Sequence, residues 1–350
     1  MPLDHYAPDV DLLYPLPPDG ETWHHHRVYT NYFGFCVPEH GLGVFVYLRC
    51  QPAFPMSQGG VMFWQGMDNI DALDAEFFDY EISMPWPTVT EDSVTTANGL
   101  RLEFIEPGRI IRLTYTSNDG NTRMDVTGTA VTPLVARGHV TPGEEDHFEG
   151  ARRPGGFEQF MHYTGDVVVN GTEYSVDTYD VRDRSIHQLR TERQDAIKVP
   201  PTCWAPMYFG DIALNHGGFE ALDTDPVWAE VYTLPPEKLV PVSGWIYSFG
   251  DREALRIVRT RRRVLEHHAV NFMPIRQELE IEDERGRILG FSGEALSTGN
   301  MPMWPNTNMR CAVYRWQDER NRVCHTVTFE LWFDRWQRAM KRRRAALAWG

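Results

Sequence analysis

The sequence predicts an all-β protein of two consecutive barrel-like units that ends in a helix. Short β-prone runs recur along the chain, separated by clusters of Gly, Pro, Asn and Asp, and this spacing is typical of a sandwich or barrel. Helical periodicity is scarce before the C-terminus. The length of 350 residues suits one large domain or two of ordinary size, so two units are the natural interpretation.

The first unit is predicted over residues 23–188, after an irregular lead-in at residues 1–22 that is rich in Pro and Asp. Residues 71–80 are expected to form a short helix or a loop. Residues 134–156 are polar and rich in Gly and Pro, which predicts a long loop. The clearest strands before that loop are 43–49, 60–65, 100–105, 109–115 and 123–132.

The second unit is predicted over residues 189–333, and residues 334–350 are predicted to form an amphipathic helix. This helix carries a basic cluster at Lys341–Arg344. The cluster favours a solvated face or a subunit contact, which leaves a homodimer open, and attachment to a membrane surface is the alternative. The clearest strands of the second unit are 244–249, 254–261, 277–283, 287–293, 311–316 and 323–333.

A β-hairpin is predicted where Asn170-Gly171 separates the β-prone runs Val167–Val169 and Tyr174–Val176, because Asn-Gly is the strongest short-range hairpin signal. A hairpin here brings its two flanks together. A carboxylate, an imidazole and phenols gathered at one mouth of a sheet are what an acid–base site requires. The residues that this hairpin is expected to gather are Glu158, Gln159, His162, Tyr163, Tyr179, Arg182, Asp183 and Arg184.

Composition excludes several classes of function. The net charge of −15 argues against a nucleic-acid binder, which needs a basic face. The first 20 residues lack a basic start followed by an apolar run, and no apolar stretch approaches the roughly 20 residues that span a bilayer, so a cytoplasmic protein without membrane insertion is expected. The five cysteines include no C-x-x-C pair, which favours buried free thiols.

Cofactor motifs are missing from the sequence. It contains no G-x-S-x-G elbow, no G-x-x-x-x-G-K-[ST] loop and no strand-linked G-x-G-x-x-G, so nucleophilic serine chemistry, nucleotide hydrolysis and nicotinamide redox chemistry are not expected. His24-His25-His26 offers a metal-site alternative, because His24 and His26 share a face of a strand and Glu39 or His40 adds a ligand. We favour packing for this run and predict no metal.

Three segments together resemble the superfamily of carotenoid hydratases (hydroxyneurosporene synthases) and AttH-like proteins. The resemblance covers residues 23–185 well and the remainder loosely, and it depends on the order and spacing of the segments. They are Trp23-His24-His25-His26 followed by Val37-Pro38-Glu39-His40-Gly41-Leu42-Gly43; Phe157-Glu158-Gln159 to Gly165; and Tyr179-Asp180-Val181-Arg182-Asp183-Arg184-Ser185.

The resemblance implies two lipocalin-like barrels in tandem, an apolar cavity and no cofactor. In the hydratases an aspartate in an aromatic-rich motif is thought to protonate a carbon–carbon double bond, and Asp183 matches that aspartate. Val181 stands where relatives have an aromatic residue, and Ile186-His187 stands in place of Trp-Gly. The resemblance therefore implies the fold more firmly than the hydration reaction, and cyclisation or isomerisation stays open.

Asp183 lies between Arg182 and Arg184. One interpretation is a strand-end salt bridge, in which an Arg neighbour keeps Asp183 ionised. Side chains alternate along a strand, however, so both Arg side chains are expected on the opposite face. Asp183 then faces an apolar cavity and keeps its proton near neutral pH. Such an acid donates to an alkene or a hydroxyl, while aromatic faces stabilise the resulting cation.

Glu158 and His162 are the second candidate pair, because residues four apart share a face of a strand. They are expected to act as a base or to set the proton state of the acid, with a hydrogen-bonded rim pair as the alternative. Tyr179 is expected to orient the substrate. The candidate substrate-binding aromatic residues are Tyr163, Trp64, Trp204 and Trp245.

These groups predict a cofactor-independent enzyme that acts on a hydrophobic substrate, such as a terpenoid, a steroid or a polyketide-like molecule. Protonation would start hydration, dehydration, isomerisation or cyclisation. The alternative is a carrier that binds an apolar ligand without changing it, as barrel interiors often do.

Overall fold

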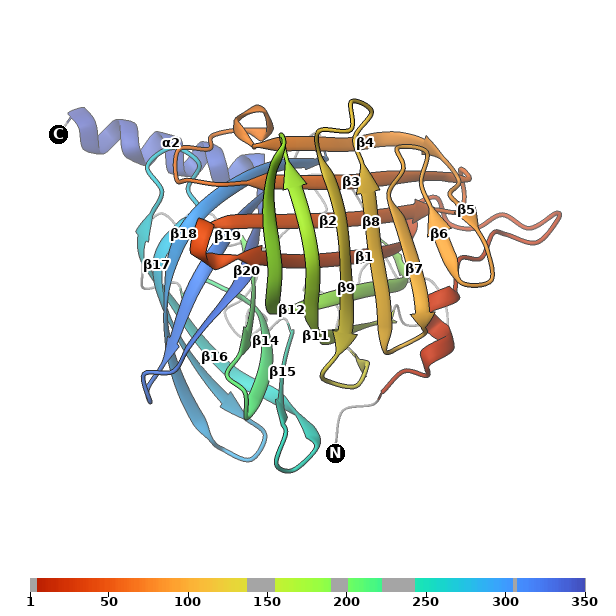
Figure 1. Cartoon of the computed structure of the whole chain (residues 1–350). Coiled ribbons are helices and arrows are strands. Elements are labelled where there is room, and N and C mark those ends of the chain that lie inside the picture. The colour runs from red at the N-terminus through yellow and green to blue at the C-terminus, as the bar shows by residue number, and fades with distance from the viewer. Residues whose placement is uncertain (1–4, 137–154, 190–200, 222–242, 305–306, 350) are drawn as a thin grey trace.

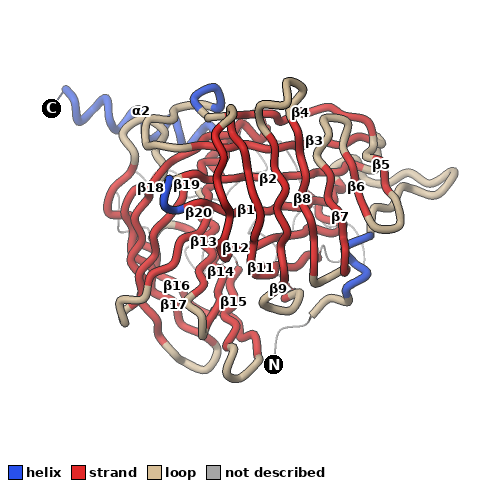
Figure 2. Tube along the Cα trace, in the orientation of Figure 1, coloured by secondary structure: helices blue, strands red, loops and turns tan. Residues whose placement is uncertain are grey.

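The computed structural model describes residues 5–136, 155–189, 201–221, 243–304 and 307–349. The predicted all-β fold with a C-terminal helix is confirmed: strands dominate both β units in Figures 1 and 2. The first unit is a 12-stranded sheet that curves as a half-barrel, and the second is a closed barrel.

The first sheet runs in the order β4-β3-β2-β1-β12-β11-β9-β8-β7-β6-β5, and β10 pairs with β11 beside this path. In Figure 1, β1 to β4 run at a steep angle to β7, β8 and β9, so that the sheet folds over on itself. Its strands are β1 (Arg27–Val37), β2 (Leu42–Gln51), β3 (Met56–Trp64), β4 (Phe77–Pro85), β5 (Thr88–Val89), β6 (Ser93–Thr95), β7 (Arg101–Glu106), β8 (Ile110–Thr116), β9 (Arg123–Ala130), β10 (Val135–Ala136), β11 (Gly155–Val169) and β12 (Thr172–Leu189).

The second unit closes in the strand order of the sequence, β13 to β20, with antiparallel neighbours throughout. An eight-stranded barrel of this kind is just wide enough for side chains or one small ligand. Its strands are β13 (Thr202–Tyr208), β14 (Ile212–Phe219), β15 (Ser243–Ser248), β16 (Glu253–His267), β17 (Pro274–Asp283), β18 (Ile288–Trp304), β19 (Thr307–Asp318) and β20 (Val323–Phe333).

Helices are few among the described residues. The predicted C-terminal helix is α2 (Asp334–Trp349), and it buries Trp336 and Met340 against Phe272 and Trp332. No described helix is long and apolar enough to cross a membrane. The short 3₁₀ helices are η1 (Pro8–Leu12), η2 (Pro38–His40) and η3 (Ala72–Asp74).

Two loop predictions need correction or fall partly outside the described residues. The expected helix or loop at residues 71–80 contains η3, but Phe77 begins strand β4, because its backbone pairs with Phe63 of β3. Of the predicted loop at 134–156, residues 135–136 form β10 and residues 155–156 begin β11, and residues 137–154 lie outside the described part of the chain.

Three apolar cores follow from the alternation of side chains along the strands. One core lies within the first sheet, around Phe33, Val46 and Tyr163. Another fills the closed barrel, around Leu279 and Trp316. The third joins the outward faces of both units, because Phe160 and Val181 of the first share one cluster with Trp204, Trp245 and Val327 of the second. This third core, called the inter-unit layer below, contains the candidate site.

The predicted hairpin is the joint of β11 and β12. Val169 pairs with Thr172, which leaves Asn170 and Gly171 as a two-residue turn. Their φ values of 50° and 82° are both positive, as the tight turns of two-residue hairpins require, and Asn and Gly tolerate this conformation best. The turn fixes the register of the whole hairpin back to Gly155.

Candidate functional site

One row of side chains crosses three neighbouring strands of the first sheet. Tyr32 of β1 pairs with Asp183 of β12, and Asp183 pairs with Glu158 of β11. Directly paired residues of antiparallel strands point to the same face, with Cβ atoms about 4.5–5.5 Å apart. Asp183 is 8% exposed and Glu158 is 0% exposed, so two buried carboxyl groups lie side by side. We call Glu158 and Asp183 the carboxyl pair.

This row faces the second unit. Glu158 Oε2 accepts a hydrogen bond from Asn215 Nδ2 of β14 at 2.7 Å and another from Trp245 Nε1 of β15 at 2.5 Å. The ring of Tyr32 lies edge-on to Trp204 of β13, with 6.5 Å between the ring centroids. The carboxyl pair therefore lies in the inter-unit layer, between the two β units.

The opposite face of the same strand is occupied by charges that have partners. Arg182 donates to both carboxylate oxygens of Asp11 at 2.8 and 2.9 Å and to Gln159 Oε1 at 2.8 Å. Arg184 donates to the backbone carbonyls of Asp11 and Leu13. The predicted alternation is confirmed: both guanidinium groups point to the N-terminal lead-in, away from the face that carries the carboxyl pair.

Two further cross-strand pairs continue the site face towards the hairpin turn, first Phe160 with Val181 and then His162 with Tyr179. The His162 ring stacks on Tyr179 with 4.4 Å between centroids, and its Nε2 lies 2.6 Å from Asp177 Oδ1. As expected, His162 shares its face with the carboxyl pair. It lies at the rim, however, where its side chain is 32% exposed.

A cavity of about 370 Å³ opens beside this rim. Tyr179 stacks on Tyr208 of β13 with 4.2 Å between centroids, so one ring comes from each unit. Burial raises the pKa of Tyr208 above its ordinary value, which keeps it a neutral phenol. The polar and aromatic side chains that line this cavity include Glu39, Asp177, Tyr179, Tyr208, Arg322 and His325.

Aromatic rings connect the cavity to the carboxyl pair. Tyr208 lies 6.2 Å from Phe160 between centroids, and Phe160 lies 6.0 Å from Trp245 in an edge-on contact. Trp245 in turn donates to Glu158. Aromatic side chains thus lie between the cavity and the carboxyl pair, and aromatic faces stabilise positive charge.

Two of the remaining predicted aromatic residues also lie in the inter-unit layer, and the third lies outside it. Trp64 is buried in the inter-unit layer, where the absence of side chains at Gly43 and Gly299 makes room for its ring. Trp204 lies in the same layer, stacked on Phe329. Tyr163 points the other way, into the core of the first sheet, and stacks on Phe35.

Sequence reasoning missed three residues that contribute to this region: Tyr32, Asn215 and Asp180. The first two come from strands far from the hairpin in sequence. Asp180 is fully buried where the β1–β12 ladder has ended, and its carboxyl accepts hydrogen bonds from the backbone N–H groups of Val181 and Val327, both at 2.7 Å. Burial raises its pKa well above the ordinary value for Asp. It ties β12 to β20, one strand from each unit.

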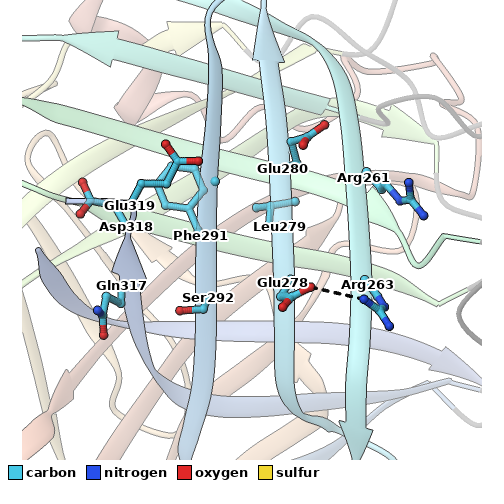
Figure 3. A pocket seen from close by; sticks show the side chains of 11 residues that line it. Arg261, Arg263, Glu278, Leu279, Glu280, Phe291, Ser292, Gln317, Asp318 and Glu319 are labelled. Carbon is cyan, nitrogen blue, oxygen red and sulfur yellow. Dashed lines mark ion pairs between the residues drawn. The ribbon is translucent and has the colours of Figure 1, made fainter. Parts of the chain in front are cut away.

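A second hollow, of about 530 Å³, lies on the closed barrel (Figure 3). Its lining is largely charged, with Glu278 and Glu280 on β17 beside Arg261 and Arg263 on β16. Arg263 lies 3.8 Å from Glu278, and both side chains are more than half exposed, so this ion pair contributes little stability. None of the predicted site residues lines it.

The histidine run is separate from the carboxyl pair. The rings of His24, His25 and His26 pack against one another, with centroids 4.1–5.6 Å apart. Among the described residues, no group of three or more His, Cys, Asp or Glu side chains is arranged to hold a metal ion. The metal alternative, with Glu39 or His40 as a third ligand, thus finds no support in the described geometry.

Comparison with known proteins gives a family and several distant structural likenesses, of which two are given below. Residues 25–327 match the family model described as "Domain of unknown function (DUF7064)". No curated protein matches the chain. Kievitone hydratase from Nectria haematococca is similar in structure, with 13% identity, a TM-score of 0.49 and coverage of 89% of this chain and 90% of that one. CghA is similar with 11% identity, a TM-score of 0.47 and coverage of 88% of each chain. Both likenesses are distant, so statements about function have to come from the site itself.

Proposed function

The chain belongs to the DUF7064 family, and we propose that it is an enzyme that converts an apolar small molecule by protonating it in the inter-unit layer. The observation that carries this proposal is the carboxyl pair. Glu158 and Asp183 are buried and directly paired across two strands, and Glu158 accepts hydrogen bonds from Asn215 and Trp245 of the other unit. Burial of two adjacent carboxyl groups needs a reason beyond packing, because burying charge is costly.

Electrostatic repulsion between the two carboxylates determines how readily the carboxyl pair holds a proton. Two carboxylates side by side raise each other's energy when both are ionised, so one proton held between them lowers the energy of the site. This repulsion contributes to the energy of the two carboxyl groups in addition to any other contact that they make. Asn215 and Trp245 both donate to Glu158, and donors favour the ionised form of the carboxyl they contact. Glu158 is therefore proposed as the carboxylate and Asp183 as the acid.

The reaction steps balance without a cofactor. The Asp183 carboxyl gives its proton to one carbon of an alkene, and the π electrons form the new C–H bond, leaving a carbocation on the other carbon. Water then adds to the cation and loses a proton to a carboxylate of the pair, which completes hydration. Loss of a proton from a neighbouring carbon completes isomerisation, and attack by a second alkene followed by proton loss completes cyclisation. Trp245 and Phe160 would stabilise the cation.

The test begins with native mass spectrometry of freshly purified protein to identify a bound apolar molecule, backed by a panel of terpenoids, steroids and polyketide-like compounds. Wild-type protein should convert one of these compounds. Asp183→Asn should lower turnover about 10²- to 10⁴-fold, the range for a general acid, with little change in melting temperature. Asp166→Asn is the matched control, because Asp166 lies on β11 and is exposed.

Full activity of Asp183→Asn would contradict the proposal. Binding of a compound that wild-type protein leaves unchanged, with affinity preserved in Asp183→Asn, would instead establish the carrier function.

A further inference from the structure

Three buried polar atoms around the carboxyl pair have no hydrogen-bond partner among the described residues: Tyr32 Oη, Trp204 Nε1 and Asn215 Oδ1. Native proteins leave few buried polar groups unpaired, because each costs free energy that water or a partner would have supplied. Three such atoms in one layer, beside a candidate acid, point to a ligand that supplies the missing partners.

Their placement brings them to one side of the site. Tyr32 is the cross-strand neighbour of Asp183, and Asn215 is bonded through its amide nitrogen to Glu158. The Tyr32 ring meets Trp204 edge-on at 6.5 Å and Phe329 edge-on at 5.4 Å between centroids. Tyr32 of β1 and Asn215 of β14 thus lie next to the carboxyl pair, and Trp204 of β13 lies next to Tyr32.

The Tyr32 hydroxyl has its position because of a glycine. A Cβ atom at Gly34 would lie 2.1 Å from Tyr32 Oη and 3.3 Å from Val327 Cβ, so only a residue without a side chain leaves room for the phenol. Burial, and after it the neighbouring Asp180, raises the pKa of Tyr32 well above its ordinary value. The phenol is consequently neutral and keeps its proton to donate.

The unpaired atoms favour an oxygen atom as the missing partner. Tyr32 and the Trp204 indole both donate, and a hydroxyl or carbonyl oxygen has two lone pairs to accept both bonds. A hydroxyl group would in addition donate to Asn215 Oδ1. A pure hydrocarbon would satisfy none of the three.

We propose that the substrate carries a hydroxyl or carbonyl oxygen, which Tyr32 and Trp204 hold beside Asp183. This inference rests on the proposed function and narrows it to oxygenated apolar molecules. Tyr32 and Trp204 are positioning residues in this arrangement, and the carboxyl pair performs the chemistry.

The first test measures the melting temperature of the ligand-free protein. Tyr32→Phe should leave the melting temperature unchanged or slightly higher, because it removes a hydroxyl that has no partner. Tyr314→Phe is the matched control: its buried hydroxyl donates to the carbonyl of Pro274, so its removal should lower the melting temperature. If Tyr32→Phe lowered the melting temperature as much as Tyr314→Phe, the hydroxyl would have a structural partner and the inference would fail.

The second test measures binding, by tryptophan fluorescence, of two probe pairs that differ in oxygen: farnesol against farnesene, and testosterone against androstane. Wild-type protein should prefer the oxygenated member of at least one pair by about tenfold, the value of one good hydrogen bond. Tyr32→Phe and Trp204→Phe should each reduce that preference and should raise KM more than they lower kcat. No preference in either pair, or an unchanged preference in both variants, would overturn the inference.

The experiments distinguish a failure of the proposed acid from a failure of the proposed oxygen-binding site. Asp183→Asn should lower turnover about 10²- to 10⁴-fold and keep the preference for the oxygenated probe. If turnover survived in that variant while the preference stayed with Tyr32 and Trp204, the acid would be wrong and the oxygen site right.

Discussion

The two faces of strand β12 carry buried charges of opposite character. On one face Arg182 and Arg184 contact the lead-in, where Asp11 and backbone carbonyls accept their hydrogen bonds. On the other face Asp183 lies beside Glu158 in an apolar layer that also contains polar atoms without a hydrogen-bond partner among the described residues. Strand β12 therefore contributes to a structural ion pair on one face and to a candidate reaction site on the other, separated only by the alternation of side chains.

This contrast teaches how to distinguish structure from function among buried charges. The Arg182 guanidinium has an opposite charge of matching geometry, which offsets the cost of its burial. The carboxyl pair places two groups of the same charge type side by side, and the neighbouring atoms Tyr32 Oη and Asn215 Oδ1 have no hydrogen-bond partner among the described residues. Buried polar groups that make all their hydrogen bonds within the protein stabilise the fold. Buried polar groups with unused hydrogen-bonding capacity can bind a ligand.

The largest expected effect on stability comes from removing the ion pair on the structural face of β12. Arg182→Met should lower the free energy of unfolding by about 3–5 kcal/mol, because it leaves the Asp11 carboxylate buried without its partner. Asp11 is held ionised in the folded protein: burial works to raise its pKa, but the Arg182 charge and hydrogen bonds outweigh burial and lower it. Urea denaturation measures the loss.

Asp183→Asn on the opposite face is the comparison for this variant, and it should cost less than about 1 kcal/mol of stability. A loss as large as that of Arg182→Met would mean that both faces are structural, and the contrast between them would disappear.

A smaller effect tests whether a buried polar group without a hydrogen-bond partner is by itself evidence of a functional site. His216 lies inside the closed barrel, and neither of its ring nitrogens has a hydrogen-bond partner among the described residues. Burial, with help from the Arg262 charge, lowers the pKa of His216 to about 3. The folded protein therefore binds this proton more weakly than the unfolded chain does, and stability is lost as pH falls from about 6.5 towards 3.

The loss should reach about 2 kcal/mol at pH 5 relative to pH 7. His216→Gln should remove it, as urea denaturation at both pH values would measure, and turnover at pH 7 should be unchanged because His216 faces the barrel interior. A strong loss of turnover in His216→Gln would extend the site into the barrel.

The sequence predicts the hairpin half of the site well, because a local turn signal determines it. Once Asn170-Gly171 fixes the register, Glu158 must lie opposite Asp183 and His162 opposite Tyr179. The alternation of side chains also explains why Tyr163, a predicted substrate-binding residue, lies away from the carboxyl pair. Tyr163 is five residues from Glu158, so the period of two places it on the other face, in the core of the first sheet.

The other half of the site depends on long-range pairing that no local signal reports. Tyr32 reaches Asp183 because β1 pairs with β12 across about 150 residues of chain, and Asn215 reaches Glu158 only because the two units pack face to face. The sequence predicts Trp245 as a substrate-binding aromatic residue, but no local signal indicates its hydrogen bond to Glu158. Likewise nothing in the Pro- and Asp-rich lead-in indicated that Asp11 would be the buried partner of Arg182.

Infrared difference spectroscopy at pH 7 tests the central claim most directly, because a protonated carboxyl group absorbs apart from a carboxylate. Asp180→Asn serves as the control, since burial raises the pKa of Asp180 and gives it a protonated band of its own. With that band assigned, a second protonated carboxyl band should be present in the wild type and lost in Asp183→Asn. Identical spectra for wild type and Asp183→Asn at pH 7 would contradict the account, because Asp183 would then hold no proton to give.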